Sequence, residues 1–188
     1  MSKRLFIAIP IKAQTLLMEQ KAFLVSNLSE EKINWVKEEN MHLTLKFIGK
    51  TSNKIIPEII EAIDKSVINM PAFPMQLERI GIFGSNYHAR VIWMGIKKND
   101  QLLKLYRQLL KEMESIGFLD DRQNFVPHLT LGRVKQILHK DHFKRVMERA
   151  EKGFIQETSI DEVVLFESIL TPDGPIYKRV KIFKLGDL

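Results

Sequence analysis

The sequence predicts an α+β fold with largely antiparallel strand pairing, built by an internal duplication. The first observation is the tetrapeptide His-Leu-Thr-Leu, which occurs at residues 42–45 and again at residues 128–131. The second is that a motif strand, a helix and a hairpin follow one another twice along the 188-residue chain. The third is that the chain contains no glycine-rich dinucleotide-binding loop. We therefore expect one motif in each of two similar halves.

Strands and helices of the first half are assigned from residue type and spacing. Strands are placed where β-branched, aromatic and aliphatic residues cluster, and helices where apolar residues recur every three or four positions. Proline and glycine mark the ends of these runs. The expected elements are a strand at 3–9, a helix at 13–28, a strand at 33–36, the motif strand at 42–48 and a helix at 56–67.

The rest of the chain completes the first succession with a hairpin and then repeats it around the second motif. The expected elements are a hairpin of strands 75–83 and 88–96, a helix at 100–116, the motif strand from 128, a helix at about 141–152 that Gly153 caps, and a closing hairpin of strands 160–170 and 176–185. The two lobes are expected to hold about half of the chain each, and no linker or low-complexity tract marks a domain boundary between them.

Composition indicates a water-soluble protein with an anionic partner. Hydrophobic residues make up 45% of the chain and charged residues 28%, while no apolar run approaches the ~20 residues of a membrane span. The apolar run near the N-terminus stops at Pro10, which favours a first strand over a signal peptide. Cysteine is absent, so disulfides and a cysteine nucleophile are excluded, and we expect a cytoplasmic protein. A net charge of +6 favours nucleic acid as the partner.

Strand geometry assigns the motif residues to two faces. Residues two apart on a strand share a face, so His42 and Thr44 point one way while the leucines between and after them point into a core. The same holds for His128 and Thr130. If a pseudo-two-fold axis relates the halves, the two polar faces meet across one groove.

Two facing imidazoles and two hydroxyls suit phosphodiester chemistry. An unperturbed imidazole titrates at about pH 6.5, so one histidine can be neutral while the other is protonated. Such a pair supplies a general base and a general acid, each worth about 10²–10⁴-fold in rate. A threonine hydroxyl can donate to a phosphoryl oxygen. We expect no metal and no other cofactor, because two histidines without an adjacent carboxylate form a thin ligand set.

A single His-x-Thr on a strand most often marks a half-buried histidine and a threonine chosen for its β propensity. The doubled and similarly flanked motif reverses that preference. A Ser-His-Asp triad stays open as an alternative, although the sequence shows no nucleophile elbow.

With these motifs and their flanks, the chain resembles the 2H phosphoesterase family, which is defined by two His-x-Thr/Ser-x motifs. More closely it resembles the bacterial and archaeal RNA 2′,3′-cyclic phosphodiesterases, also called 2′-5′ RNA ligases. The resemblance covers nearly the whole chain and rests on residues 4–10, Trp35, and residues 42–49, 81–83, 90–93, 127–133, 166–168 and 174–177.

The resemblance implies a single domain over residues 1–188 with two lobes, whose motifs line opposite walls of a central cleft while helices cover the outside. It implies opening of a terminal RNA 2′,3′-cyclic phosphate to a 2′-phosphomonoester, and in some members 2′-5′ joining to a 5′-hydroxyl. His42 would protonate the departing 3′ oxygen, and His128 would activate water. Thr44 and Thr130 would hold the non-bridging oxygens. The partner would be RNA with a cyclic phosphate end, bound by a monomer.

Three further residues are candidate contacts. Arg133 is the expected extra phosphate ligand, although regular alternation places it opposite His128, so a bulge or strand end is needed to turn it inward. Lys46, in phase with His42, is a candidate RNA contact but more simply an exposed lysine. Tyr177, beside a turn, is a candidate base or ribose contact.

The other polar and aromatic residues are expected to be structural or simply exposed. The stretch 84–89 lacks the proline that relatives often carry, which puts RNA contacts from it in doubt. A basic helix and last strand form either an RNA track or a solvated face. Residues expected on the surface are His88, His139 and His142, and aromatic residues expected in the core are Phe6, Trp35, Phe47 and Trp93.

Two alternatives to RNA end hydrolysis stay open. One is a 2H phosphoesterase that acts on a small cyclic nucleotide or on ADP-ribose cyclic phosphate. The other is a non-catalytic RNA-binding module that uses the same cleft.

Overall fold

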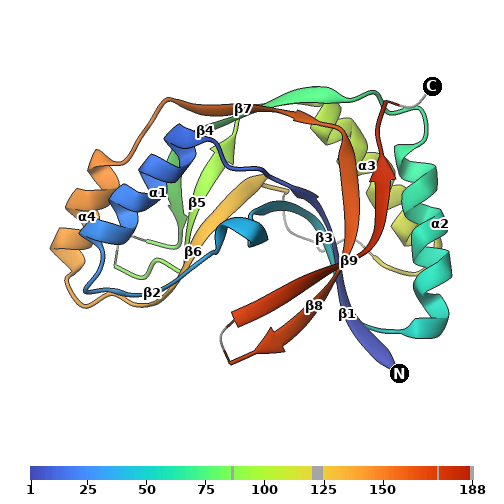
Figure 1. Ribbon diagram of the computed structural model, residues 1–188, viewed down its shortest axis with the longest axis horizontal. Coiled ribbons are helices and arrows are strands. Elements are labelled where there is room, and N and C mark those ends of the chain that lie inside the picture. The colour runs from blue at the N-terminus through green and yellow to red at the C-terminus, as the bar shows by residue number, and fades with distance from the viewer. Residues whose placement is uncertain (86, 120–124, 173, 187–188) are drawn as a thin grey trace.

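The computed structural model describes residues 1–85, 87–119, 125–172 and 174–186 (Figure 1). Its helices are α1 (Thr15–Asn27), α2 (Ile56–Val67), α3 (Asp100–Ser115) and α4 (Lys140–Arg149), with short 3-10 turns η1 (Glu38–Asn40) and η2 (Asn53–Ile55). Its strands are β1 (Ser2–Pro10), β2 (Lys32–Trp35), β3 (His42–Ser52), β4 (Phe73–Phe83), β5 (Val91–Ile96), β6 (His128–Gln136), β7 (Phe154–Ile160), β8 (Glu162–Thr171) and β9 (Gly174–Lys184). No helix among these residues is long and apolar enough to cross a bilayer.

The strands form one connected antiparallel arrangement in the order β7-β4-β5-β6-β3-β1-β8-β9, with β2 paired to β6. The two motif strands, β3 and β6, are neighbours at its centre and pair through Leu43 and Leu129. On one side of this junction the strands follow in the order β3, β1, β8, β9, and on the other side in the order β6, β5, β4, β7. Each side thus consists of a motif strand followed by three further strands. The predicted α+β class, with antiparallel pairing and a pseudo-two-fold duplication, is confirmed.

The lobes do not coincide with consecutive halves of the chain, so that expectation is wrong. The closing hairpin β8–β9 pairs with β1 beside the first motif strand, whereas β4 and β5 pair beside the second motif strand. The hairpin that follows each motif in sequence therefore belongs to the lobe of the other motif (Figure 1). Antiparallel pairing places no limit on the sequence separation of partners, so element order alone does not reveal this exchange.

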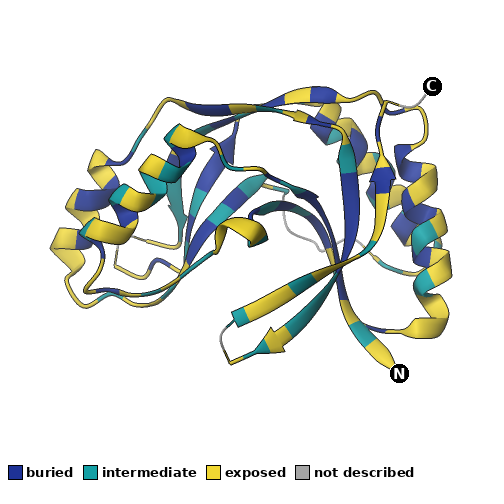
Figure 2. Ribbon diagram, viewed as in Figure 1, coloured by how far each residue is buried: buried dark blue, intermediate teal, exposed yellow. Residues whose placement is uncertain are grey.

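Each lobe carries a pair of helices on its outer side. Helices α2 and α3 pack together and α2 also contacts β9, so they cover the lobe of β1, β3, β8 and β9 (Figure 1). Helix α1 contacts β7, and the guanidinium of Arg149 in α4 lies 5.8 Å from the ring centroid of Phe23 in α1. Figure 2 shows buried positions on the central strands and on the sides of the helices that face them. The main core thus lies between helices and strands.

Strand β1 separates this main core from a second cluster. Leu5, Ile7 and Ile9 join the main core, whereas the alternate residues Phe6 and Ala8 face the other way. There they form a small cluster with Val164 and Phe166, and Tyr177 packs against it. This second face of β1 is the one that carries the site.

Several predicted boundaries need correction. Strand β7 has no counterpart among the expected elements, because its centre, Gln-Glu-Thr-Ser, is polar. Strand β5 begins at Val91 rather than at 88, and the stretch before it includes Asn86, which lies outside the described residues. Helix α4 ends at Arg149 with Ala150 as its C-cap, so the predicted Gly153 cap is wrong. The other predicted elements lie where the spacing places them.

Candidate active site

The two motifs meet at the β3–β6 junction. Leu43 pairs with Leu129 in the antiparallel register, so position 42 lies next to position 130 and position 44 next to position 128. Each histidine therefore neighbours the threonine of the other copy. All four motif leucines are buried, whereas the histidines and threonines are partly exposed. The alternation predicted from the sequence is confirmed.

Both imidazoles are oriented by the same hydrogen bond. The Nδ1 atom of His42 lies 2.7 Å from the backbone oxygen of Asn40, and Nδ1 of His128 lies 2.7 Å from that of Val126. A carbonyl oxygen can only accept, so each Nδ1 carries the hydrogen and donates it. In the neutral ring, Nε2 is then the basic atom. Two equivalent backbone carbonyls thus fix the tautomer that acid–base chemistry at Nε2 requires.

Aromatic rings hold each imidazole from the side. The His42 ring centroid lies 5.1 Å from that of Phe6 and 5.2 Å from that of Tyr177, with the tyrosine ring nearly perpendicular. The ring of His128 stands perpendicular to Phe83 at 4.7 Å. These contacts remove part of the water that a charged imidazole would need.

Burial lowers the pKa of both histidines, and the hydrogen bonds to the backbone carbonyls only partly oppose it. The positive charge of Arg133 lowers both pKa values further, and a proton on His128 lowers the pKa of His42. Burial and the nearby charges favour the neutral form of the two rings in the unliganded protein. The sequence-based expectation of one neutral and one protonated imidazole used the unperturbed value, which this environment lowers for both rings.

Arg133 reaches the site through a β-bulge. On β5, Trp93 pairs with Thr130 and the next residue back, Ile92, pairs with Gly132, which leaves Leu131 as an extra residue in β6. The bulge reverses the alternation after Leu131, so Arg133 shares the face of Thr130. Arg133 is exposed and lines the same cavity as His42 and Thr130. The condition set by the sequence for an inward Arg133 is met.

The first motif contains the matching bulge, and it moves Lys46 away from the site. Ala8 pairs with Thr44 and Ile7 with Lys46, so Leu45 is the extra residue. Lys46 then shares the face of Ile7, toward the main core. It is only 5% exposed, and its Nζ donates to the carbonyl oxygen of Leu119 at 2.8 Å. The predictions that Lys46 is exposed and in phase with His42 are wrong, and this position removes it from the candidate RNA contacts.

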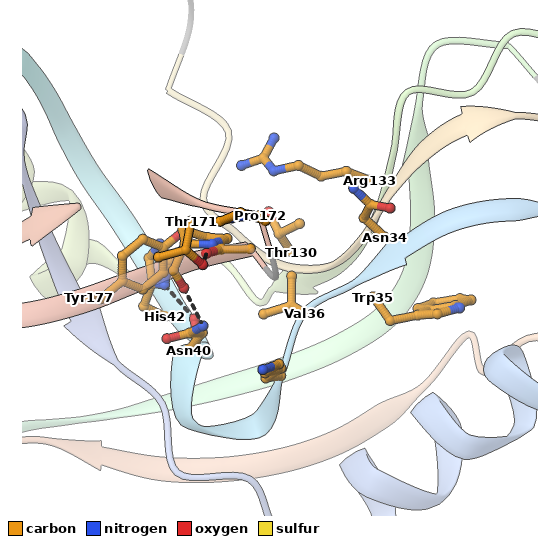
Figure 3. Close-up of a pocket in the computed structure, with 13 residues that line it drawn as sticks. Asn34, Trp35, Val36, Asn40, His42, Thr130, Arg133, Thr171, Pro172 and Tyr177 are labelled. Atoms are coloured by element: carbon orange, nitrogen blue, oxygen red, sulfur yellow. Dashed lines mark hydrogen bonds between the residues drawn. The ribbon is translucent and has the colours of Figure 1, made fainter. Parts of the chain in front are cut away.

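A cavity of about 470 Å³ opens beside His42 (Figure 3). Its walls come from three segments: β2 with η1, the two motif strands, and the tip of the β8–β9 hairpin. The lining residues are Asn34, Trp35, Val36, Lys37, Asn40, His42, Thr130, Arg133, Thr171, Pro172, Gly174, Pro175 and Tyr177. His128 and Thr44 do not line the cavity. In the register of β3 and β6 they are neighbours of each other, on the same face as His42 and Thr130.

Tyr177 and Asn40 join the hairpin to the first motif. Tyr177 lines the cavity, as a base or ribose contact would require, and burial raises the pKa of its hydroxyl, which stays protonated as a donor. The Nδ2 atom of Asn40 donates to the carbonyl oxygen of Pro175 at 3.1 Å, while its own backbone oxygen holds His42 (Figure 3). Sequence reasoning missed Asn40, along with Asn34 and Lys37, because single polar residues in the short segments before the motif belong to no repeated motif.

The other sequence candidates divide by location. His88, His139 and His142 are exposed, as predicted. Phe6 is buried and Trp35 and Trp93 are partly buried, but Phe47 is 55% exposed, so its predicted core position is wrong. Among the described residues, no three histidine, cysteine, aspartate or glutamate side chains gather in a group that could hold a metal ion.

Comparison with known families decides the classification. A family model described as the 2′-5′ RNA ligase superfamily matches residues 25–169, which is most of the chain. The chain belongs to the 2′-5′ RNA ligase superfamily. This confirms the family indicated by the two motifs.

Among relatives of this superfamily member is an RNA 2′,3′-cyclic phosphodiesterase of Thermotoga maritima, 36% identical over 177 residues that cover 93% of this chain and 91% of the relative. A protein of the same name from Methanocaldococcus jannaschii is 33% identical, covering 95% of this chain and 98% of its own. Among solved structures, E. coli LigT complexed with 3′-AMP superposes with a TM-score of 0.75 at 22% identity over the full length of both chains. This last likeness concerns the fold.

Proposed function

We propose that the protein hydrolyses the 2′,3′-cyclic phosphate at the end of an RNA strand to a 2′-phosphomonoester, with His42 and His128 as the acid–base pair. The observation that carries this proposal is the equivalent anchoring of both imidazoles, which makes Nε2 the reactive atom of each at one strand junction. The names of the relatives from Thermotoga maritima and Methanocaldococcus jannaschii support the substrate.

In the proposed reaction, Nε2 of neutral His128 takes a proton from water as the water oxygen attacks phosphorus. The bond from phosphorus to O3′ breaks in line with this attack, and Nε2 of protonated His42 donates its proton to O3′. The products are a free 3′-hydroxyl and a 2′-phosphomonoester. The two rings end with their protonation states exchanged.

One proton shared by the pair fits the electrostatics of the site. Because a proton on His128 lowers the pKa of His42, the doubly protonated pair is disfavoured. The phosphate brings a negative charge to the site, which raises the pKa of the nearby imidazoles and lets one of them hold a proton. Substrate binding therefore converts two neutral rings into one acid and one base.

Thr44, Thr130 and Arg133 are proposed to hold the phosphate. A hydroxyl beside each histidine can donate to a non-bridging oxygen. The guanidinium of Arg133, turned inward by the bulge at Leu131, can bind the phosphate oxygens with two parallel N–H groups. Arg133 also lowers the pKa of both histidines, so its charge acts on the pair as well as on the phosphate.

The same geometry supports 2′-5′ joining. If a 5′-hydroxyl takes the place of water, His128 removes its proton, the 5′ oxygen attacks phosphorus and O3′ leaves with the proton from His42. The product is a 2′-5′ phosphodiester with a free 3′-hydroxyl. Water and a 5′-hydroxyl then compete for one site, and the name of the superfamily supports this second outcome.

The proposal is tested with a short RNA that ends in a 2′,3′-cyclic phosphate. The expected product is a 2′-phosphomonoester. Removal by a phosphatase identifies it as a monoester, and its phosphorus resonance distinguishes it from the 3′ isomer. A 3′-phosphomonoester as the product would contradict the assignment of O3′ as the leaving group. An RNA whose cyclic phosphate stays closed would contradict the proposal as a whole.

A further inference from the structure

Next to the cavity, three exposed side chains form a strip on the β1–β3 face: Phe47, Arg4 and Lys50, here called the aromatic–basic strip. The ring centroid of Phe47 lies 6.2 Å from that of Phe6, which in turn lies 5.1 Å from that of His42. The strip is thus continuous with the catalytic histidine through one aromatic ring. It lies outside the residues that line the cavity.

The bulge at Leu45 turns Phe47 onto this face. Phe47 pairs with Phe6, which points away from the main core into the second cluster. In the duplicated motif, Phe47 stands where Arg133 stands in the other copy, two residues after the bulged leucine. The equivalent position therefore holds a cation in one copy of the motif and an exposed ring in the other. At 55% exposure the ring of Phe47 is open to a flat partner.

Arg4 and Lys50 extend the strip along the same face. They pair directly across β1 and β3, and Arg4 shares the face of Phe6 because the two residues are two apart on β1. Both are exposed, and within the described residues neither forms a salt bridge. The charge of Arg4 lowers the pKa of the Tyr177 hydroxyl in the cavity wall, against the larger effect of burial, so Arg4 lies on the side of the site.

We propose that the aromatic–basic strip binds the RNA strand leading away from the cyclic end, with a base stacked on Phe47 and backbone phosphates held by Arg4 and Lys50. This inference rests on the proposed function and names its substrate class: an oligonucleotide end rather than a free cyclic mononucleotide. An exposed ring beside cations that form no salt bridge is the arrangement that binds single strands, because each base offers a π-face and each phosphate a charge. The +6 net charge of the chain agrees with such a partner.

The test compares two substrates in each variant: an oligonucleotide with a 2′,3′-cyclic phosphate end and the matching cyclic mononucleotide. The measured quantity is the ratio of their kcat/KM values. Phe47→Ala is expected to lower this ratio about tenfold, because one base no longer stacks. Phe154→Ala is the matched control, because Phe154 is 57% exposed and lies on β7 at the far edge of the other lobe. It is expected to leave the ratio unchanged.

The charges are tested by salt dependence. Arg4→Gln with Lys50→Gln is expected to lower the ratio and to flatten the plot of log(kcat/KM) against log[salt] by about 0.7 for each phosphate that the variant no longer neutralises. Lys104→Gln with Lys111→Gln removes the same charge from α3 and is expected to keep the wild-type slope. Circular dichroism of every variant separates these effects from unfolding.

An equal ratio in the wild type, Phe47→Ala and Arg4→Gln/Lys50→Gln would overturn the inference while hydrolysis of both substrates still supports the proposed function. A wild-type protein that hydrolyses the cyclic phosphate of neither substrate would overturn the proposed function, and the inference with it.

Discussion

Leu43 of β3 is the direct antiparallel partner of Leu129 of β6, and both side chains are completely buried. This pair is the point where the two lobes join and where the two motif copies cross. It places each histidine beside the threonine of the other copy, so the geometry of the site depends on packing beneath it. The core and the proposed chemistry are thereby linked through two leucines.

Leu43→Ala is expected to lower the free energy of unfolding by about 2–5 kcal/mol, because it opens a cavity where the lobes meet. Urea unfolding followed by circular dichroism measures this change. Leu170→Ala serves as the control, since Leu170 is 68% exposed and its truncation should change the free energy by no more than about 0.5 kcal/mol. Equal losses in the two variants would contradict the central position of Leu43.

The pH dependence of kcat/KM is expected to lie on the acidic side of the ordinary histidine value of about 6.5. Burial and Arg133 lower the pKa of both histidines, so the base becomes neutral, and the acid loses its proton, at lower pH than in free imidazole. The bell-shaped profile therefore shifts to lower pH as a whole. A profile centred above pH 7 would contradict the site environment described above.

Arg133→Gln is expected to move the same profile toward higher pH. Removing the positive charge raises the pKa of both histidines, because their protonated forms no longer meet a like charge. The rate also falls because the phosphate loses a ligand, so the position of the profile is the informative quantity. Lys104→Gln on α3 provides the control and should leave the profile in place. A lower rate without any shift would mean that Arg133 binds phosphate but does not act on the histidines.

Asn40→Ala is expected to reduce kcat/KM for the RNA end by about two- to tenfold. It removes the hydrogen bond to Pro175, worth about 0.5–1.5 kcal/mol, and so loosens the hairpin that carries Tyr177. The backbone oxygen that holds His42 is retained, so the pH profile should keep its position. Steady-state kinetics across pH separate the two effects. A shifted profile would show that the side chain of Asn40 acts through His42 instead.

The faces of the motif residues could be assigned from the sequence. Alternation along a strand places histidine and threonine on one face and the two leucines on the other within only four residues. Sequence reasoning found no sign of the bulge at Leu45 and named a bulge near Arg133 only as a condition, since Leu45 and Leu131 are ordinary strand residues and nothing in their type marks an extra residue. The two bulges reverse what regular alternation assigns to three residues: Lys46 lies in the core, Phe47 is exposed, and Arg133 faces the site. The lowered histidine pKa values could not be predicted either, because they come from burial and from a charge that the bulge positions.

The hairpin exchange between lobes was also beyond the sequence. The strand at 160–170 and its partner follow the second motif in sequence, which suggests that they belong to the lobe of that motif. In the structure β8 pairs with β1 instead, and the hairpin brings Tyr177 to His42. Only the pairing of distant strands, which depends on tertiary packing, decides this. Tyr177, which packs against the ring of the first histidine, therefore comes from the last strand of the chain.

The central claim is that His42 and His128 act as one acid–base pair, and the most direct test is kcat/KM on a cyclic-phosphate-ended RNA for four proteins. These are the wild type, His42→Ala, His128→Ala and the double variant, each checked for folding by circular dichroism. Each single variant is expected to lose at least about 10²-fold, and the double variant little more than either, because residues that act as a unit are non-additive. A single variant within about tenfold of the wild type, or losses that multiply in the double variant, would contradict the account.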